Sequence, residues 1–293
     1  MGHYHLVHCI PHPRMHGLNG YKEVIETVTW GFEQLGHRVT YAINDVATET
    51  TNIIFGAQVM SLAALKQLPD NTIIYNFEQL RGYTPNQLKE QIKYCAQDKR
   101  FKLWEYSQIN VPSWQTLGRH EMKVVPIGYA PVLTRIPRAA NQDIDVLIYG
   151  MSGERRLQAF HALSQTGLTT VFVSGIYGAA RDDLISRCKI VLNINLWKSR
   201  IFEVVRVSYL LANKKAVVAD LDADTGVEED LRGAVRFASS LQELVTICHS
   251  LIDNEAERIK AEEAGFASMR RRDITTILRS ALLIEKPAGY SRT

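Results

Sequence analysis

The chain of 293 residues is long for one typical domain and suits two. Apolar residues make up 46% and charged residues 22%, a composition typical of a soluble globular protein. The net charge of +3 is too small to indicate nucleic-acid binding, and no apolar run approaches the roughly 20 residues of a membrane-spanning helix.

The first half of the chain alternates short apolar strands with helices. Val24, Val28 and Phe32 recur at helical spacing, and Gly36 is placed to end their helix. The full set of elements predicted here is strands over residues 4–10, 38–43, 51–57, 71–77, 101–107 and 122–131, and helices over residues 21–35, 62–68 and 85–97. This alternation is typical of a parallel sheet covered by helices.

Residues 132–145 mix proline, arginine and polar side chains without periodicity, which predicts a linker. The alternation then restarts, with strands over residues 145–150, 169–175, 189–195 and 215–220, helices over 153–167 and 178–188, a helix from about Arg200, and closing helices over 240–272, in one or two pieces, and 273–285. We therefore predict an α/β fold of two doubly wound Rossmann-like domains that face a cleft.

The expected domain limits are residues 1–138 and 139–275. Residues 276–293 form a C-terminal helix and tail, for which packing back on the first domain is one arrangement. Open α/β sheets bind ligands at the carboxyl ends of their strands. This rule points to the loops that follow Ile10, Phe77, Gly150, Gly175 and Asn195.

Neither the cysteines nor the histidines indicate a metal site. The four cysteines are far apart, without a CxxC pair, and are expected to be reduced core thiols of a cytoplasmic protein. The N-terminus lacks the basic and apolar regions of a signal peptide. Five histidines lie in the first sixteen residues and three aspartates in residues 220–224, but neither group has the spacing of a zinc site or a calcium loop. We read the basic run 270–272 as a solvated helix face, with a phosphate- or membrane-facing patch as the alternative.

The stretch "IFEVVRVSYLLANKK", residues 201–215, is mostly apolar but begins with Glu203 and Arg206, three residues apart. The helix starts at the carboxyl edge of the second sheet, where its free amides suit a phosphate. Glu203 could then reach ribose hydroxyls, and Arg206 could neutralise phosphate or brace Glu203. A capping carboxylate with an ordinary i,i+3 salt bridge is the structural alternative.

The segment "VLNIN…IFEVVRVSYLLANKKAVVAD" resembles the nucleotide-sugar-binding segment of bacterial GT-B glycosyltransferases, closest to those of family 1 or family 4-like. Other segments match in order over roughly residues 5–220, among them "IIYNFEQL", "WEYSQIN", "DIDVLIYG" and "GIYGAARDDLISRCKIVLN". The chain departs from the broader pattern because Asn195 and Leu211 stand where a second glutamate of E-x7-E would be. That departure leaves the sugar-binding roles open.

The resemblance implies a donor site in the second domain and an acceptor site in the first. On the donor side, it makes Glu203 the ribose-binding residue, directs the loop after the first strand toward a diphosphate, and assigns Tyr177 to the nucleobase. The donor-binding residues so implied are Gly150, Ser152, Gly153, Arg155, Arg156, Tyr177, Asn195, Phe202, Glu203 and Arg206.

On the acceptor side, the resemblance implies that a histidine before the first long helix lies at the reaction centre. We therefore predict His16 as general base or acceptor ligand, with His12 second. Glu78, at the end of a strand, is the competing base or acceptor-orienting group. Asn19 and Tyr106 complete the acceptor-side set, although Tyr106 could equally be a core aromatic residue.

The expected function is transfer of a sugar from a nucleotide-sugar donor to a hydroxyl acceptor, as a hexosyl- or other glycosyltransferase without metal or cofactor. The acceptor, whether glycan, lipid-linked glycan, small molecule or protein, is not indicated, and peripheral membrane contact stays open. Two alternatives remain: a non-catalytic GT-B-like protein that binds a nucleotide or sugar and assists a partner, and a transferase acting on nucleic acid.

Overall fold

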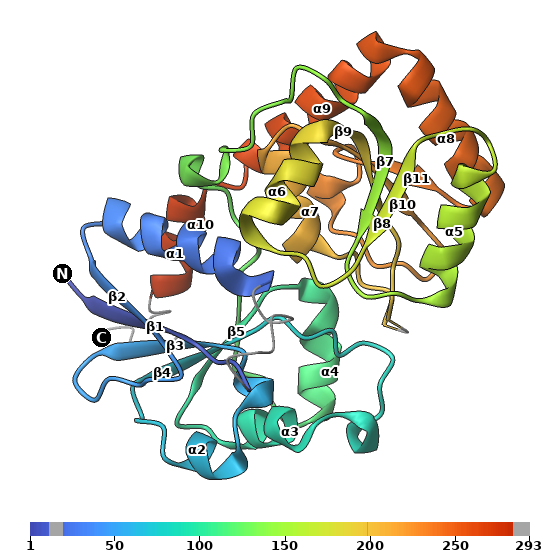
Figure 1. Ribbon diagram of the computed structural model, residues 1–293. Helices are drawn as coiled ribbons and strands as arrows, with labels where there is room; N and C mark the ends of the chain where they lie inside the picture. The colour runs from blue at the N-terminus through green and yellow to red at the C-terminus, as the bar shows by residue number, and fades with distance from the viewer. Residues whose placement is uncertain (12–19, 198, 284–293) are drawn as a thin grey trace, which may run out of the picture.

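The computed structural model describes residues 1–11, 20–197 and 199–283, and these residues form two separate parallel sheets (Figure 1). The first sheet has the order β2-β1-β3-β4-β5-β6, and its strands are β1 (His3–His8), β2 (Arg38–Ile43), β3 (Thr51–Phe55), β4 (Thr72–Asn76), β5 (Lys102–Glu105) and β6 (Lys123–Val124). The second has the order β11-β10-β9-β7-β8, and its strands are β7 (Ile144–Tyr149), β8 (Thr170–Val173), β9 (Cys188–Asn193), β10 (Ala216–Asp220) and β11 (Arg236–Ala238). The predicted fold class, two doubly wound α/β sheets, is confirmed.

Helices cover both faces of each sheet. On the first sheet they are α1 (Lys22–Gln34), α2 (Leu62–Lys66), α3 (Glu90–Gln97) and α4 (Val111–Thr116), and on the second α5 (Glu154–Ser164), α6 (Gly178–Arg187), α7 (Val204–Ala212), α8 (Leu241–Asp253) and α9 (Glu255–Arg270). The last helix is α10 (Ile274–Leu282). Figure 1 shows α1 on the face of the first sheet that is turned toward the second, with α2 and α3 on the opposite face.

The burial of β7 explains why its sequence is continuously apolar. Val146 and Ile148 belong to the core under α5 and α8, whereas Leu147 and Tyr149 belong to the core under α6 and α7. Successive side chains of a strand point to opposite faces, so a strand that is covered on both faces needs apolar residues throughout. Gly150 directly follows the carboxyl end of this buried strand and lines the cavity between the two sheets.

The chain leaves the first sheet at Val124 and enters the second at Ile144. It returns at the end, because α10 packs against α1 (Figure 1). Gly31 makes this contact close: a Cβ there would lie 2.7 Å from a methyl carbon of Leu278. The residue limits of the two domains stay a prediction.

Three local predictions were wrong. The helix expected from about Arg200 begins at Val204, because Arg200 has a left-handed φ of 45° and Ile201 is bridged to Gly226. The strand expected over 122–131 is only two residues long. The helix expected over 85–97 starts as a 3₁₀ turn, and its α-helical part begins at Glu90.

The basic run near the C-terminus also differs from expectation. Arg270 and Arg271 are exposed, but Arg272 is 7% exposed and ion-paired with Glu228 and Asp230. Arg272 therefore belongs to the protein interior and not to a solvated face.

The four cysteines are buried free thiols. Among the described residues, no helix combines the length and the apolar character needed to cross a membrane.

Candidate functional site

A cavity of about 300 Å³ lies between the two sheets at the carboxyl ends of their strands. The first sheet lines it mainly with Tyr21, Glu23, Phe77, Glu78, Gln79 and Tyr106, and the second with Tyr149, Gly150, Met151, Arg156, Tyr177, Arg181, Leu196, Trp197, Glu203, Arg206 and Tyr209. On the second sheet the strand order reverses between β7 and β9, and the loops after these two strands border the cavity. Such a reversal point is where open α/β sheets bind ligands.

Gly150 has a φ of 121°, a conformation that favours glycine. A Cβ at this position would lie 2.6 Å from Nη2 of Arg206 and 3.1 Å from Nη1 of Arg156. Two guanidinium groups therefore lie directly against the backbone of the loop that follows β7. This is the loop that the sequence predicts to face a diphosphate.

The two arginines are in different environments. Arg156 is 1% exposed and donates to the backbone oxygen of Ile194 from Nε and Nη2 (2.9 and 2.8 Å) and to that of Met151 from Nη1 (2.8 Å). Burial lowers the pKa of this guanidinium. Arg206 retains 21% of its side-chain surface and lies over the ring of Tyr149. Arg156 thus joins two loops of the second sheet, while Arg206 is the better placed of the two to meet a ligand.

Glu203 is the N-cap residue of α7, without a side-chain capping bond. Its carboxylate lies 2.7 Å from Nη2 of Arg156 and 2.8 Å from Nη1 of Arg206, and it accepts a long bond from the amide of Leu196. The ordinary i,i+3 salt bridge between Glu203 and Arg206, which the sequence offered as the alternative to ligand binding, is therefore present. The side chain also lines the cavity, so ribose binding by Glu203 stays a prediction.

On the first-sheet side, Glu78 follows β4. Oε1 of Glu78 accepts a bond from Nε2 of Gln58 (2.8 Å) and one from the hydroxyl of Tyr21 (3.3 Å). Tyr106 is 2% exposed yet lines the cavity, so it is both a core aromatic residue and part of the cavity wall. Burial raises the pKa of the Tyr106 phenol well above its usual range, which keeps it neutral.

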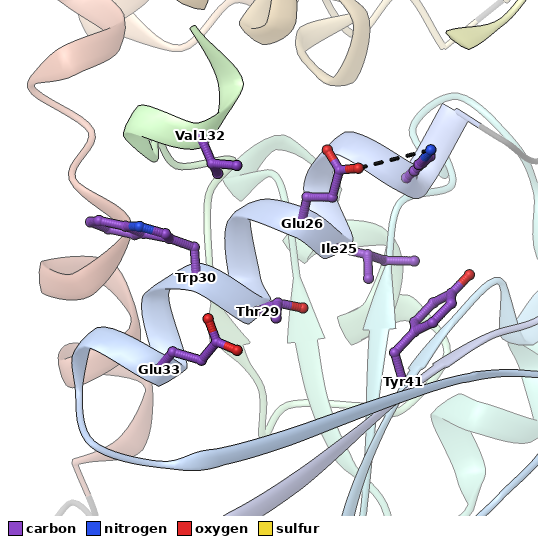
Figure 2. A pocket seen from close by; sticks show the side chains of 8 residues that line it. Ile25, Glu26, Thr29, Trp30, Glu33, Tyr41 and Val132 are labelled. Atoms are coloured by element: carbon purple, nitrogen blue, oxygen red, sulfur yellow. Dashed lines mark ion pairs between the residues drawn. The ribbon is translucent and has the colours of Figure 1, made fainter. Parts of the chain in front are cut away.

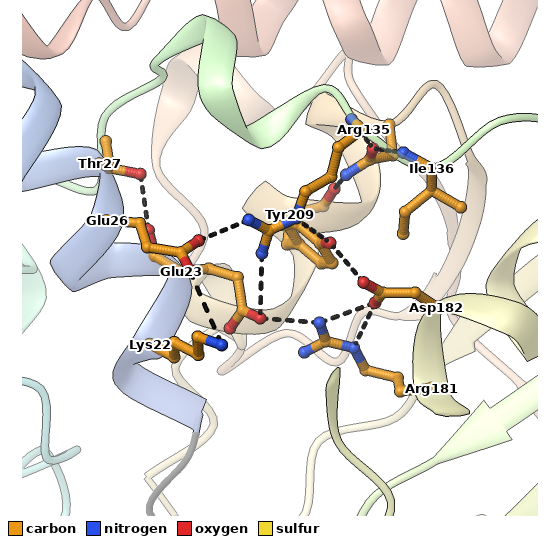
Figure 3. A network of polar contacts seen from close by, with 10 residues as sticks. Lys22, Glu23, Glu26, Thr27, Arg135, Ile136, Arg181, Asp182 and Tyr209 are labelled. Atoms are coloured by element: carbon orange, nitrogen blue, oxygen red, sulfur yellow. Dashed lines mark hydrogen bonds and ion pairs between the residues drawn. The ribbon is translucent and has the colours of Figure 1, made fainter. Parts of the chain in front are cut away.

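A polar network bridges the two sheets beside this cavity (Figure 3). Glu23 of α1 lies 2.7 Å from Arg181 of α6, and both side chains are less than 10% exposed. Arg135 pairs with Glu26 (2.7 Å), and the hydroxyl of Tyr209 accepts a bond from Nε of Arg135 (3.0 Å). Burial by itself would lower the pKa of Arg181, but the hydrogen bond and charge of Glu23 outweigh it and raise the pKa.

The remaining predicted donor residues are spread over several environments. Tyr177 lines the cavity, and Gly153 is the N-cap of α5. Ser152 is exposed and is not part of the described lining. Asn195 is 4% exposed, and neither atom of its side-chain amide has a hydrogen-bond partner among the described residues. The donor residues therefore converge only in part.

Two predicted donor residues point elsewhere. Arg155 lies outside the described lining of the cavity and pairs with Asp220 (2.7 Å) and Asp222 (3.1 Å). Phe202 is 2% exposed and packs against the ring of Phe237 in the core. The first is held by two carboxylates and the second by apolar packing, so neither side chain is presented to the cavity.

The predicted acceptor-side residues His12, His16 and Asn19 lie outside the described residues. Their roles stay predictions. Within the described ranges, no group of three or more His, Cys, Asp or Glu side chains is arranged to hold a metal ion.

A second cavity, of about 370 Å³, lies on the outer side of α1 and is lined by Ile25, Trp30, Tyr41 and Val132 (Figure 2). Its charged members are Lys22, Glu26 and Glu33, of which Lys22 and Glu26 pair with each other at 4.0 Å. The loops at the carboxyl ends of the second sheet do not contribute to its described lining. It therefore lacks the convergent polar groups of the cavity between the sheets, which we take as the candidate site.

Several residues of the cavity were missed from the sequence. Glu23 and Arg181 lie on helices that read as ordinary surface helices, and Trp197 was passed over although it is 49% exposed beside the cavity. Gln79 had a usable signal, because it directly follows Glu78 at the carboxyl edge of β4. Its side chain donates to the backbone oxygen of Ile201 (3.0 Å) and so joins the loops of the two sheets.

No family model and no curated protein sequence matches the chain. Solved structures do match. AviGT4, a glycosyltransferase involved in avilamycin A biosynthesis, has a TM-score of 0.59 and 14% identity, with 96% of each chain covered. Alr3699/HepE of Anabaena in complex with UDP and glucose has a TM-score of 0.58 and 13% identity, covering 96% of this chain and 98% of its own. An alpha-glucosyltransferase in complex with UDP has a TM-score of 0.61 and 10% identity, with the same coverage.

Each match spans both sheets and nearly the whole length of both chains. At these identities the likeness establishes the architecture, in which two parallel α/β sheets meet at a cleft lined by the carboxyl ends of their strands. This chain has the GT-B fold of glycosyltransferases.

Proposed function

We propose that this chain is a glycosyltransferase that moves a sugar from a nucleoside-diphosphate sugar to a hydroxyl acceptor without a metal ion. The observation that carries the proposal is the position of Arg206, against the positive-φ Gly150 and in the first turn of α7, at the reversal point of the second sheet. A partly exposed guanidinium beside a helix N-terminus is suited to a diphosphate.

The charges on the second-sheet wall of the cavity favour an anionic ligand there, whereas the first-sheet wall carries Glu23 and Glu78. Arg156 and Arg206 together face one carboxylate, Glu203, so the group keeps an excess of positive charge before a ligand arrives. Departure of a nucleoside diphosphate develops negative charge, which preorganised cations stabilise in a water-poor site. Matched glycosyltransferase structures are complexes with UDP or UDP-glucose, which favours such a donor.

The proposed acceptor side is the first-sheet wall of the cavity. Glu78 projects there from the end of β4, and the proton of an acceptor hydroxyl needs a base within hydrogen-bond reach. His16 remains the other proposed base. Replacing each of them in turn, with nucleotide affinity measured alongside turnover, decides between them: the base is the residue whose loss lowers turnover by about 10²–10⁴-fold at unchanged affinity.

The donor site is tested with Arg206→Met. We expect this variant to weaken binding of a nucleoside diphosphate such as UDP by about 1.5–3 kcal/mol, because one charge-assisted hydrogen bond is lost. The matched control is Arg155→Met, whose guanidinium is held by Asp220 and Asp222 outside the cavity. Isothermal titration of both variants measures the effect, and equal affinity in the two would contradict the proposal.

Metal independence is tested separately. Sugar transfer should persist in EDTA, since none of the described side chains form a ligand set. Activity that EDTA abolishes and a divalent cation restores would overturn this part of the proposal. Nucleotide binding without any transfer would instead support the non-catalytic alternative.

A nucleic-acid acceptor is the second candidate, because one matched structure is an alpha-glucosyltransferase with UDP-glucose and DNA, at a TM-score of 0.60 and 10% identity. The net charge of +3 makes a broad phosphate-binding surface unfavourable. Binding of a DNA duplex that weakens steeply with salt would favour this acceptor, and its absence would leave a glycan, lipid-linked glycan, protein or small molecule.

A further inference from the structure

Beneath the first-sheet wall of the cavity lies a completely buried carboxylate. Glu105, the last residue of β5, is 0% exposed and forms no ion pair with any described residue. Oε2 accepts bonds from Nδ2 of Asn76 and Nε1 of Trp114, both at 2.7 Å. Oε1 accepts bonds from the backbone amide of Ser107 (2.9 Å) and from Nδ2 of Asn110 (3.0 Å).

The same two asparagines, Asn76 and Asn110, also hydrogen-bond to the backbone of the loop after β4. Nδ2 of Asn76 and Nδ2 of Asn110 also donate to the backbone oxygen of Glu78, at 3.0 and 2.8 Å. Their Oδ1 atoms accept from the amides of Glu78 (3.1 Å) and Leu80 (2.8 Å). Four bonds therefore hold three backbone groups of residues 78–80.

The carboxylate decides how both amides are oriented. In its ionised form Glu105 only accepts hydrogen bonds, so each asparagine must then turn its NH₂ group toward it. The Oδ1 atom of each amide is then left to face a backbone N–H of the loop. Without this acceptor, either amide could rotate and present a donor to a donor.

The loop held in this way carries two side chains of the cavity. Glu78 is a proposed base. Gln79 donates to the backbone oxygen of Ile201 (3.0 Å) and accepts a bond from the hydroxyl of Ser199, both in the loop that leads to Glu203. The position of residues 78–80 therefore affects both the reacting group and the contact between the two sheets.

We infer that Glu105 is a positioning residue that, through Asn76 and Asn110, fixes the backbone of residues 78–80 and so sets where Glu78 and Gln79 stand in the cavity. The catalytic part of this inference rests on the proposed function. A buried, unpaired charge is costly, and an apolar side chain could fill the same space at lower cost. The presence of a carboxylate at this position is therefore explained by its orientation of the Asn76 and Asn110 amides.

Glu105→Gln tests the inference with almost no change of volume. The new NH₂ group must face at least one of the four donors, so an asparagine amide turns or loses its bond. At pH 8, we expect hydrogen exchange at the Glu78 and Leu80 amides to accelerate roughly tenfold. We also expect kcat to fall by about 10- to 100-fold from misplacement, with the Kd for UDP unchanged within about twofold.

Trp114→Phe is the matched control. It removes one donor from Glu105 but none of the bonds between the asparagines and residues 78–80. This variant should lose stability while its exchange at Glu78 and Leu80 and its kcat stay near those of the wild type. Asn110→Ala should reproduce the behaviour of Glu105→Gln, and it provides the test if Glu105→Gln does not fold.

Equal effects of Glu105→Gln and Trp114→Phe on exchange and kcat would reduce Glu105 to a stabilising residue and overturn the inference. The exchange comparison does not depend on catalysis. If the wild type binds no nucleotide and transfers no sugar, the proposed function fails, while faster exchange in Glu105→Gln alone would still support positioning of the loop.

Discussion

At the scale of single residues, the carboxyl group of Glu105 makes stability depend on pH. Burial raises its pKa from the ordinary 4.5 to about 7, and the four donors offset this only in part. Between these values the unfolded chain is ionised while the native protein keeps its proton. The native state then binds more protons, so the free energy of unfolding falls as pH rises from about 4.5 to about 7.

We predict that Glu105→Gln removes this part of the pH dependence. The contribution amounts to at most about 1.4 kcal/mol per pH unit, the value of one proton. Urea unfolding of both proteins at pH 5, 6, 7 and 8 measures it as the difference between two profiles. That difference should change between pH 5 and 7 and level off above 7, and parallel profiles throughout would show that Glu105 titrates normally.

At the scale of secondary-structure elements, α10 carries the end of the chain back to the first sheet. Leu278 is 0% exposed and packs against Gly31 of α1. We predict that Leu278→Ala lowers the free energy of unfolding by about 2–5 kcal/mol, the usual cost of a buried leucine. Leu283→Ala is the control, because that side chain is 68% exposed just beyond the helix. Thermal unfolding of both variants measures the effect. If the two variants lost comparable stability, the packing of α10 on α1 would not stabilise the protein in solution.

At the scale of the whole molecule, the buried pair of Glu23 and Arg181 ties the two sheets together beside the candidate site (Figure 3). We predict that Arg181→Met destabilises the protein by about 3–5 kcal/mol, because it leaves a buried carboxylate with a weakened partner set. Small-angle scattering should show a larger radius of gyration, as the sheets are less tightly joined.

Two further variants distinguish the stability lost with the Glu23–Arg181 ion pair from the stability lost with any arginine side chain of α6. Adding Glu23→Gln to Arg181→Met should recover much of the stability, since the unpaired charge is then gone. Arg187→Met, on the same helix, should change little because the Arg187 ion pairs are exposed. If the double variant were no more stable than Arg181→Met, repulsion by an unpaired Glu23 would not explain the loss.

The sequence was sufficient for the fold class because the relevant signals are local. Apolar runs of strand length that alternate with amphipathic helices, such as β7 and α1, predict covered parallel sheets without knowledge of any distant contact. The rule that ligands gather at the carboxyl ends of strands then singled out Gly150, Glu78 and Tyr177, and all three line one cavity. The salt bridge between Glu203 and Arg206 followed from helical spacing alone.

Tertiary structure decided everything that depends on residues far apart in the sequence. Arg156 meets Glu203 across 47 positions, and Glu23 meets Arg181 across 158. Tertiary structure also turned Arg155 away from the cavity and Arg156 toward it, although both are arginines at adjacent positions of α5. Adjacent helical residues differ in direction by about 100°, so only the packing of the helix determines which of them is buried at the site.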